Sequence, residues 1–136
     1  MSSADQSDKT KRFSKTFKHP DERRDFFSHG HLDLLKFEDG TEIGLGVFEP
    51  GWRWSNDVKP IAGTKSCEAA HTGYCLKGSM TIRMDSGEEI KIKAGDAIHI
   101  LPGHDAWVDG EETCELLDVT GYANYAVRKK EFKKGA

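Results

Sequence analysis

The side chains best suited to chemistry in this sequence are those of histidine, cysteine and tryptophan. The chain holds six histidines, three cysteines and three tryptophans among 136 residues. Imidazole is a common ligand for zinc, nickel, copper and iron. A polar ring aimed into a small core must also find a partner. A histidine in this chain therefore indicates either a ligand site or a hydrogen-bonded pocket residue.

Cys67 precedes His71 by four residues, a spacing that places both side chains on one face of a strand. On a straight strand their Cα atoms would lie about 13 Å apart. That is too far for one metal ion, because bonds to zinc measure only about 2.0–2.3 Å. A bulge or bend would bring the two side chains together. Cys67 is therefore either a pocket residue or a small core residue, and Cys75 and Cys114 are expected to pack in the core.

Three tryptophans are the other candidate pocket residues. Trp52 and Trp54 are spaced to share one strand face, and Trp107 lies farther along the chain. Indole rings can wall a pocket for a planar or apolar ligand, and they can equally fill a protein core. Trp52, Trp54, Cys67 and Trp107 together form the predicted pocket.

Alternation of apolar and polar residues predicts the elements that position these side chains. Such alternation buries one face of a strand and exposes the other. Turns with glycine separate the runs, and Asp39-Gly40 is a strong hairpin signal because both turn positions take positive φ. About nine or ten short strands with little helix predict an all-β sandwich or barrel. The predicted strands are 31–37, 41–49, 74–76, 80–84, 89–93, 97–101, 107–108, 114–119 and 122–127, after a short helical turn over 19–24.

Length and composition limit the domain count and the function classes. The chain fits one domain over 19–128, with a flexible polar arm over 1–18 and a basic tail over 129–136. The net charge is −3, which argues against a nucleic-acid-binding protein. No run of about 18 apolar residues is present, so no membrane span is expected. An odd number of cysteines and no signal peptide predict a cytoplasmic protein with reduced thiols.

The segment 49–118 resembles the cupin family of small single-domain barrels. Residues 95–103 read Gly-Asp-Ala-Ile-His-Ile-Leu-Pro-Gly, like the opening of the second cupin motif. Pro50-Gly51 matches the start of the first motif, and His71 with Gly78 fills the frame that ends it. The resemblance implies a cupin-like jelly-roll barrel, the double-stranded β-helix. It also implies a homodimer formed through an edge strand, for which 31–37 is the candidate.

The metal ligands of the family are where the sequence departs from it. Cupins usually supply His-x-His and Glu from the first motif and one His from the second. Here no His-x-His is present, His71 stands at the Glu position and Ala106 stands at the second-motif His position. His104 lies two residues before Ala106, and therefore on the same strand face, where it can replace the absent ligand. The resemblance thus implies His71 and His104 as metal ligands, unless His71 only hydrogen-bonds a neighbour and His104 faces solvent.

Two further features mark an atypical subgroup. The first motif is longer than the family pattern, which predicts an inserted loop over 55–65. Trp-x-Trp-Ser at 52–55 and Gly-His-Asp-Ala-Trp at 103–107 recur in a cupin subgroup that this chain resembles.

These features leave two functions open. The first is a small cupin enzyme that binds a small organic molecule beside a divalent metal ion (zinc, nickel, iron or manganese) and polarises or activates oxygen. The second is a non-catalytic binding or sensing cupin without metal. A nucleic-acid-binding barrel has the same strand pattern, but the negative charge disfavours it. The sequence leaves open whether the protein is an enzyme.

Overall fold

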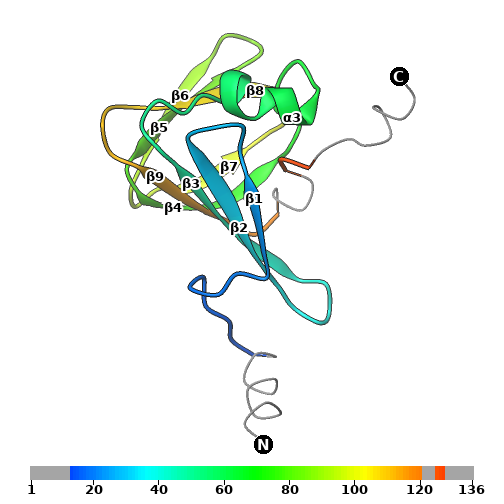
Figure 1. The fold of residues 1–136 in the computed structure, drawn as a ribbon. Helices are drawn as coiled ribbons and strands as arrows, with labels where there is room; N and C mark the ends of the chain where they lie inside the picture. Colours follow the sequence, from blue (N-terminus) through cyan, green and yellow to red (C-terminus); the bar gives the residue numbers. More distant parts are fainter. Residues whose placement is uncertain (1–12, 121–124, 128–136) are drawn as a thin grey trace, which may run out of the picture.

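The computed structural model of the protein describes residues 13–120 and 125–127, so the predicted tail over 129–136 lies outside the described residues, as does the predicted arm up to residue 12. The described part is all-β, as predicted, with two helices of one turn each (Figure 1). The strands are β1 (Glu22–Asp25), β2 (Gly30–Lys36), β3 (Glu42–Phe48), β4 (His71–Lys77), β5 (Ser79–Met84), β6 (Glu89–Lys93), β7 (Ala97–Ile100), β8 (His104–Val108) and β9 (Cys114–Asp118). The helices are α2 (Trp54–Asp57) and α3 (Lys59–Ala62).

Two antiparallel sheets enclose the core. One has six strands in the order β1-β2-β3-β9-β4-β7, and the other has three in the order β6-β5-β8. Alternate residues of β8 and β9 are buried, which is the period-two pattern read from the sequence. Among the described residues, strand pairing does not join the two sheets into one closed barrel. Instead, the connection from β3 to β4 contacts β8 through two isolated bridges, Arg53 with Trp107 and Cys67 with His104.

Most predicted strands are confirmed, and the helical turn predicted over 19–24 is wrong. Residues Glu22–Asp25 form β1, which pairs antiparallel with β2 and places Arg24 opposite Leu32. Pairing with β1 satisfies the backbone N–H and C=O groups along one side of β2. These groups would be unpaired if β2 were the edge strand. Arg23 also forms an ion pair with Asp33 across the two strands, with Nε and Oδ1 2.7 Å apart. Of the strand predicted over 122–127, only residues 125–127 are described, and Tyr125 lies in a turn.

The predicted inserted loop folds as the two helices. Trp54 and Ile61 are their buried apolar residues, and Asp57 is buried with its carboxylate accepting the Arg53 backbone N–H at 2.9 Å. Gly63 ends α3 in the left-handed region with φ of 75°, which glycine adopts without strain. The first helix, α2, contacts β8, and the chain then continues through α3 to Cys67.

The edge strand proposed for a dimer is wrongly placed. β2, which corresponds to the predicted strand 31–37, pairs with β1 on one side and β3 on the other, so it is interior to the sheet. Among the described strands, β1 and β7 are the outer ones of the larger sheet. No helix in residues 13–120 or 125–127 has the length and apolar character required to cross a membrane.

Candidate functional site

A small cavity lies between the two sheets and has a mostly apolar wall. It leaves about 20 Å³ in which the centre of a water molecule fits, so it admits only a small group of one or a few heavy atoms. Its wall contains His71 and His104 beside aromatic and aliphatic side chains. The lining residues are Phe48, Trp52, Trp54, His71, Met80, Ile82, Ile98, Ile100, His104, Ala106, Leu116 and Tyr125.

His71 is the first residue of β4, and Asp118 orients its ring. Asp118 is the last residue of β9, is 2 % exposed, and has Oδ2 2.6 Å from Nδ1 of His71. When Nδ1 donates its proton to this carboxylate, the lone pair of Nε2 is available to a metal ion. Carboxylates in this position fix the ring orientation of metal-binding histidines and raise their basicity.

His104 is oriented by a backbone carbonyl. Its Nδ1 lies 2.9 Å from the oxygen of Leu101. A carbonyl oxygen only accepts, so Nδ1 carries the proton and Nε2 presents its lone pair. Burial lowers the pKa of His104 below its usual 6.5, which keeps the ring neutral at physiological pH.

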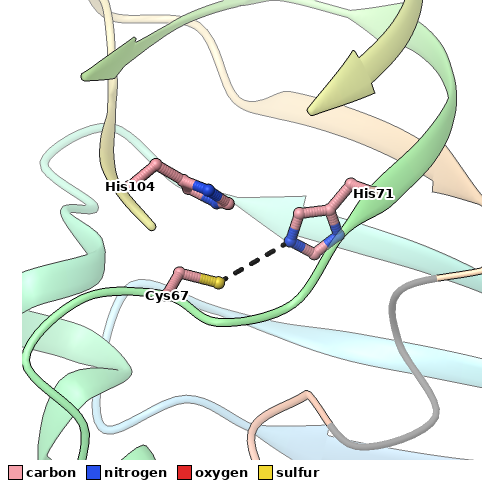
Figure 2. A group of neighbouring side chains, drawn as sticks. All are labelled: Cys67, His71 and His104. Atoms are coloured by element: carbon pink, nitrogen blue, oxygen red, sulfur yellow. Dashed lines mark hydrogen bonds between the residues drawn. The ribbon is translucent and has the colours of Figure 1, made fainter. Parts of the chain in front are cut away.

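Cys67 meets His71 because the chain between them is bent. Cys67 pairs with His104 in an isolated bridge, in which its N–H donates to the His104 oxygen at 2.7 Å. β4 begins only at His71, so the four residues do not form the straight strand that would hold the pair apart. The Cys67 sulfur lies 3.7 Å from Nε2 of His71 (Figure 2). Burial raises the pKa of the Cys67 thiol to about 12, so the metal-free protein holds it protonated.

The three side chains converge on one point (Figure 2). The ligand atoms of Cys67, His71 and His104 all lie within 4.8 Å of one another, and all three residues are buried. In a tetrahedral zinc site, sulfur and nitrogen ligands are separated by about 3.6 Å. The observed 3.7 Å between the Cys67 sulfur and His71 Nε2 is close to that value. The donors present therefore fit a divalent metal ion that has one thiolate and two imidazole ligands.

The predicted pocket residues separate into two groups. Trp52 and Trp54 line the cavity, and each is 2 % exposed. Trp107 points to the opposite face of β8 from His104 and is not among the lining residues. The guanidinium of Arg53 lies over its ring, with the Arg53 Cζ 4.3 Å from the centroid.

The sequence reasoning missed Asp118 and Tyr125. Asp118 alternates with Cys114 and Leu116 on the buried face of β9. An acidic residue at a position that the alternation predicts to be buried could have been identified from the sequence. Asp105, next to His104 in the sequence, accepts the backbone N–H of Ser55 at 3.0 Å. Tyr125 is buried and its ring centroid lies 5.4 Å from that of His71. Nothing in the local sequence pattern predicts that contact.

Comparisons with known proteins agree with this architecture. Residues 63–120 match the family described as "Cupin domain". No curated protein matches the chain by sequence. Solved structures similar to it include the polyketide cyclase RemF from Streptomyces resistomycificus, with a TM-score of 0.56, 19% identity, and coverage of 79% of this chain and 78% of RemF.

Two further similar structures are cupins. A cupin-like protein from Thermotoga maritima has a TM-score of 0.50 and 18% identity, over 85% of this chain and 96% of its own. An RmlC-like cupin from Shewanella frigidimarina has a TM-score of 0.50 and 15% identity, over 82% of this chain and 96% of its own. At these identities the likeness shows a shared fold.

Proposed function

Because residues 63–120 match the cupin domain family and similar solved structures share the fold, we propose that the protein is a metal-dependent cupin that binds a small ligand at Cys67, His71 and His104. One observation carries the proposal. Three buried donor side chains converge, two of them, His71 and His104, in the wall of a mostly apolar cavity, and hydrogen bonds fix both imidazole rings. One thiol and two imidazoles within reach of one point are a donor set that suits a divalent metal ion.

The donor set favours zinc among the four metals expected from the sequence. Thiolate and imidazole ligands suit zinc, whereas manganese prefers carboxylates, carbonyls and water. Zinc sites with three protein ligands keep a fourth position for water or substrate. A bound divalent ion supplies Lewis acidity toward an oxygen atom and lowers the pKa of bound water.

The residues of the chain have distinct roles in this proposal. Asp118 holds the proton of His71 on Nδ1, and the Leu101 carbonyl does the same for His104. Cys67 must lose its proton when the ion binds, so metal uptake releases protons. The aromatic and aliphatic wall excludes water from the ligand atoms, which strengthens every charge interaction inside it.

The size of the cavity limits the ligand. About 20 Å³ for a water centre accommodates a group of one or a few heavy atoms and not a sugar or an aromatic ring. RemF is named as a polyketide cyclase. The small cavity of this chain favours a compact ligand.

A non-catalytic binding or sensing role is the second candidate. Among the described residues that line the cavity, none is Asp, Glu, Lys or Arg. Acid–base chemistry would then depend on Tyr125 and on the two histidines, both of which are assigned to the metal. Turnover that disappears with His71→Ala would rule out the sensing role.

The state of the three cysteines bears on the compartment that we propose for the protein. Cys67, Cys75 and Cys114 are free and buried, which suits a reducing compartment such as the cytoplasm.

We propose a homodimer as well, with β1 or β7 as the pairing edge. Light scattering that gives a monomer mass at micromolar concentration would contradict it.

Elemental analysis of the purified protein tests the metal centre directly. After growth with supplemented zinc, we expect about one metal ion per chain, as a single site with three protein ligands requires. His71→Ala and Cys67→Ser should lose most of the metal. His99→Ala is the matched control, because His99 is exposed on β7 and hydrogen-bonds Thr72 instead. Protein free of metal after loading with zinc, nickel and iron would overturn the proposal.

A further inference from the structure

The indole N–H of Trp52 is a buried donor with no acceptor. Trp52 is 2 % exposed, and its Nε1 has no hydrogen-bond partner among the described residues. Buried donors of this kind are rare in folded proteins, and each one calls for an explanation. The position of Trp52 in the wall of the cavity, with His71 and His104, indicates one.

The surroundings of Trp52 restrict what can accept the bond. Aromatic rings hold the indole in place: its centroid lies 4.5 Å from that of Phe48 and 6.0 Å from that of Phe26. Apart from the two histidines and Tyr125, the cavity wall is made of apolar and aromatic side chains. In the proposed metal centre both histidines present Nε2 to the ion. Since no described residue accepts the bond from Trp52, a molecule inside the cavity is the acceptor that its position offers.

We propose that Trp52 is the ligand-orienting donor of the metal centre, with its N–H bonded to a compact ligand that carries an acceptor oxygen or nitrogen. The inference rests on the proposed function, since the ligand is the one that takes the fourth metal position. The cavity volume restricts this ligand to a few heavy atoms, the size of hydroxide, formate or azide. Trp52 thus selects ligands that have an acceptor over equally small apolar ones.

Azide binding to the cobalt-loaded protein tests the proposal. Cobalt replaces zinc in tetrahedral sites and gives visible absorption, so metal uptake and azide binding are measured separately. Trp52→Phe removes the N–H and keeps an aromatic ring. We expect unchanged cobalt stoichiometry and an azide Kd that is about tenfold weaker. Trp107→Phe, outside the cavity wall, is the matched control and should keep the wild-type Kd.

The outcomes separate the two proposals. A wild-type protein that takes up no cobalt overturns the metal centre and, with it, the role of Trp52. Cobalt uptake with the same azide Kd in wild type and Trp52→Phe overturns the role of Trp52 alone.

A second measurement uses the wild-type chain and does not depend on the variant folding. In zinc-loaded protein labelled with nitrogen-15, the Trp52 indole proton, assigned through its contacts with Phe48, should move downfield when azide or formate is added. An upfield resonance that does not respond would show that the N–H points at the Phe48 ring, and would overturn the proposal.

Discussion

Two oxygen atoms determine which nitrogen each histidine presents to the cavity. The carboxylate of Asp118 holds Nδ1 of His71, and the carbonyl of Leu101 holds Nδ1 of His104. Both rings therefore direct Nε2 to the same place. The difference between the two partners matters, because the carboxylate is charged and can be removed by substitution, whereas the carbonyl belongs to the backbone.

Asp118→Asn should weaken metal binding without removing a ligand. The amide cannot stabilise a polarised imidazole as the carboxylate does, so the metal Kd should rise by about 10–100-fold. Competition with a chromophoric chelator measures it. Asp96→Asn, in the turn before β7, is the control and should bind as wild type does. Equal affinities for Asp118→Asn and wild type would show that the carboxylate plays no part in holding the metal.

The metal-free protein should lose stability in mild acid because of His104. Its folded-state pKa lies below the unfolded value of 6.5, so the unfolded chain binds more protons as the pH falls. Stability is then full above pH 6.5 and declines below it, by at most about 1.4 kcal/mol per pH unit. Urea unfolding at pH 7.5 and 5.5 measures the loss.

Variants identify the histidine responsible. His104→Gln should reduce the difference between the two pH values, and His99→Gln should leave it unchanged. A full acid loss in His104→Gln would assign the effect to other groups.

At the scale of elements, the contact between β4 and β9 holds Asp118 beside His71. Gly73 pairs with Asp118 across these strands. A Cβ atom on Gly73 would lie 1.7 Å from the backbone oxygen of Leu117. The close approach of the two backbones therefore requires glycine at this position, although its φ is not in the left-handed region.

Gly73→Ala should push β9 away from β4 and loosen the Asp118–His71 bond. We expect a loss of about 1–3 kcal/mol in the free energy of unfolding, typical of overpacking. Metal affinity should fall in the same variant. Thr72→Ala, one residue earlier on the outer face, serves for comparison. Thermal and urea unfolding with a chelator titration measure both effects, and a fully stable Gly73→Ala would contradict the close approach.

The sequence predicted the elements better than the contacts between them. Alternation identified eight of the nine strands, because each buries one face, and the structure extends the predicted strand 107–108 back to His104, which is buried on the same face as Ala106. It missed β1, whose charged residues give no apolar period. The meeting of Cys67 with His71 depends on a bend that no local pattern encodes. Asp118 could have been found from its parity, whereas the position of Tyr125 depends on tertiary packing.

At the scale of the molecule, Tyr125 closes the cavity from beyond the last strand. Its ring packs edge-on against Phe26 and His71, with centroid distances of 6.0 and 5.4 Å. Its backbone oxygen accepts a bond from Arg24 of β1 at 2.9 Å. The first and last described parts of the fold thus meet at the wall of the site, and together they set its volume.

Tyr125→Ala should widen the cavity and broaden the range of ligands. Removing a buried aromatic ring costs about 3–5 kcal/mol in stability, so the variant is best studied at low temperature with metal bound. The cobalt-loaded variant should bind imidazole, which wild type should exclude, and it should keep one ion per chain. Val127→Ala provides the exposed control. Imidazole binding to wild type with equal strength would show that Tyr125 does not limit the cavity.

The bridge between Cys67 and His104 has a consequence for which ions can enter. Two short backbone hydrogen bonds, from Cys67 N–H to the His104 oxygen and from Gly103 N–H to the Cys67 oxygen, are each 2.7 Å long. They lock the Cα positions of two ligands, so that pair cannot spread apart without breaking the bonds. In the proposed metal centre, a larger ion such as cadmium, with longer bonds to sulfur, would have to be accommodated by the side chains or by movement of His71. The fixed spacing of the two backbones should therefore favour ions that form shorter bonds.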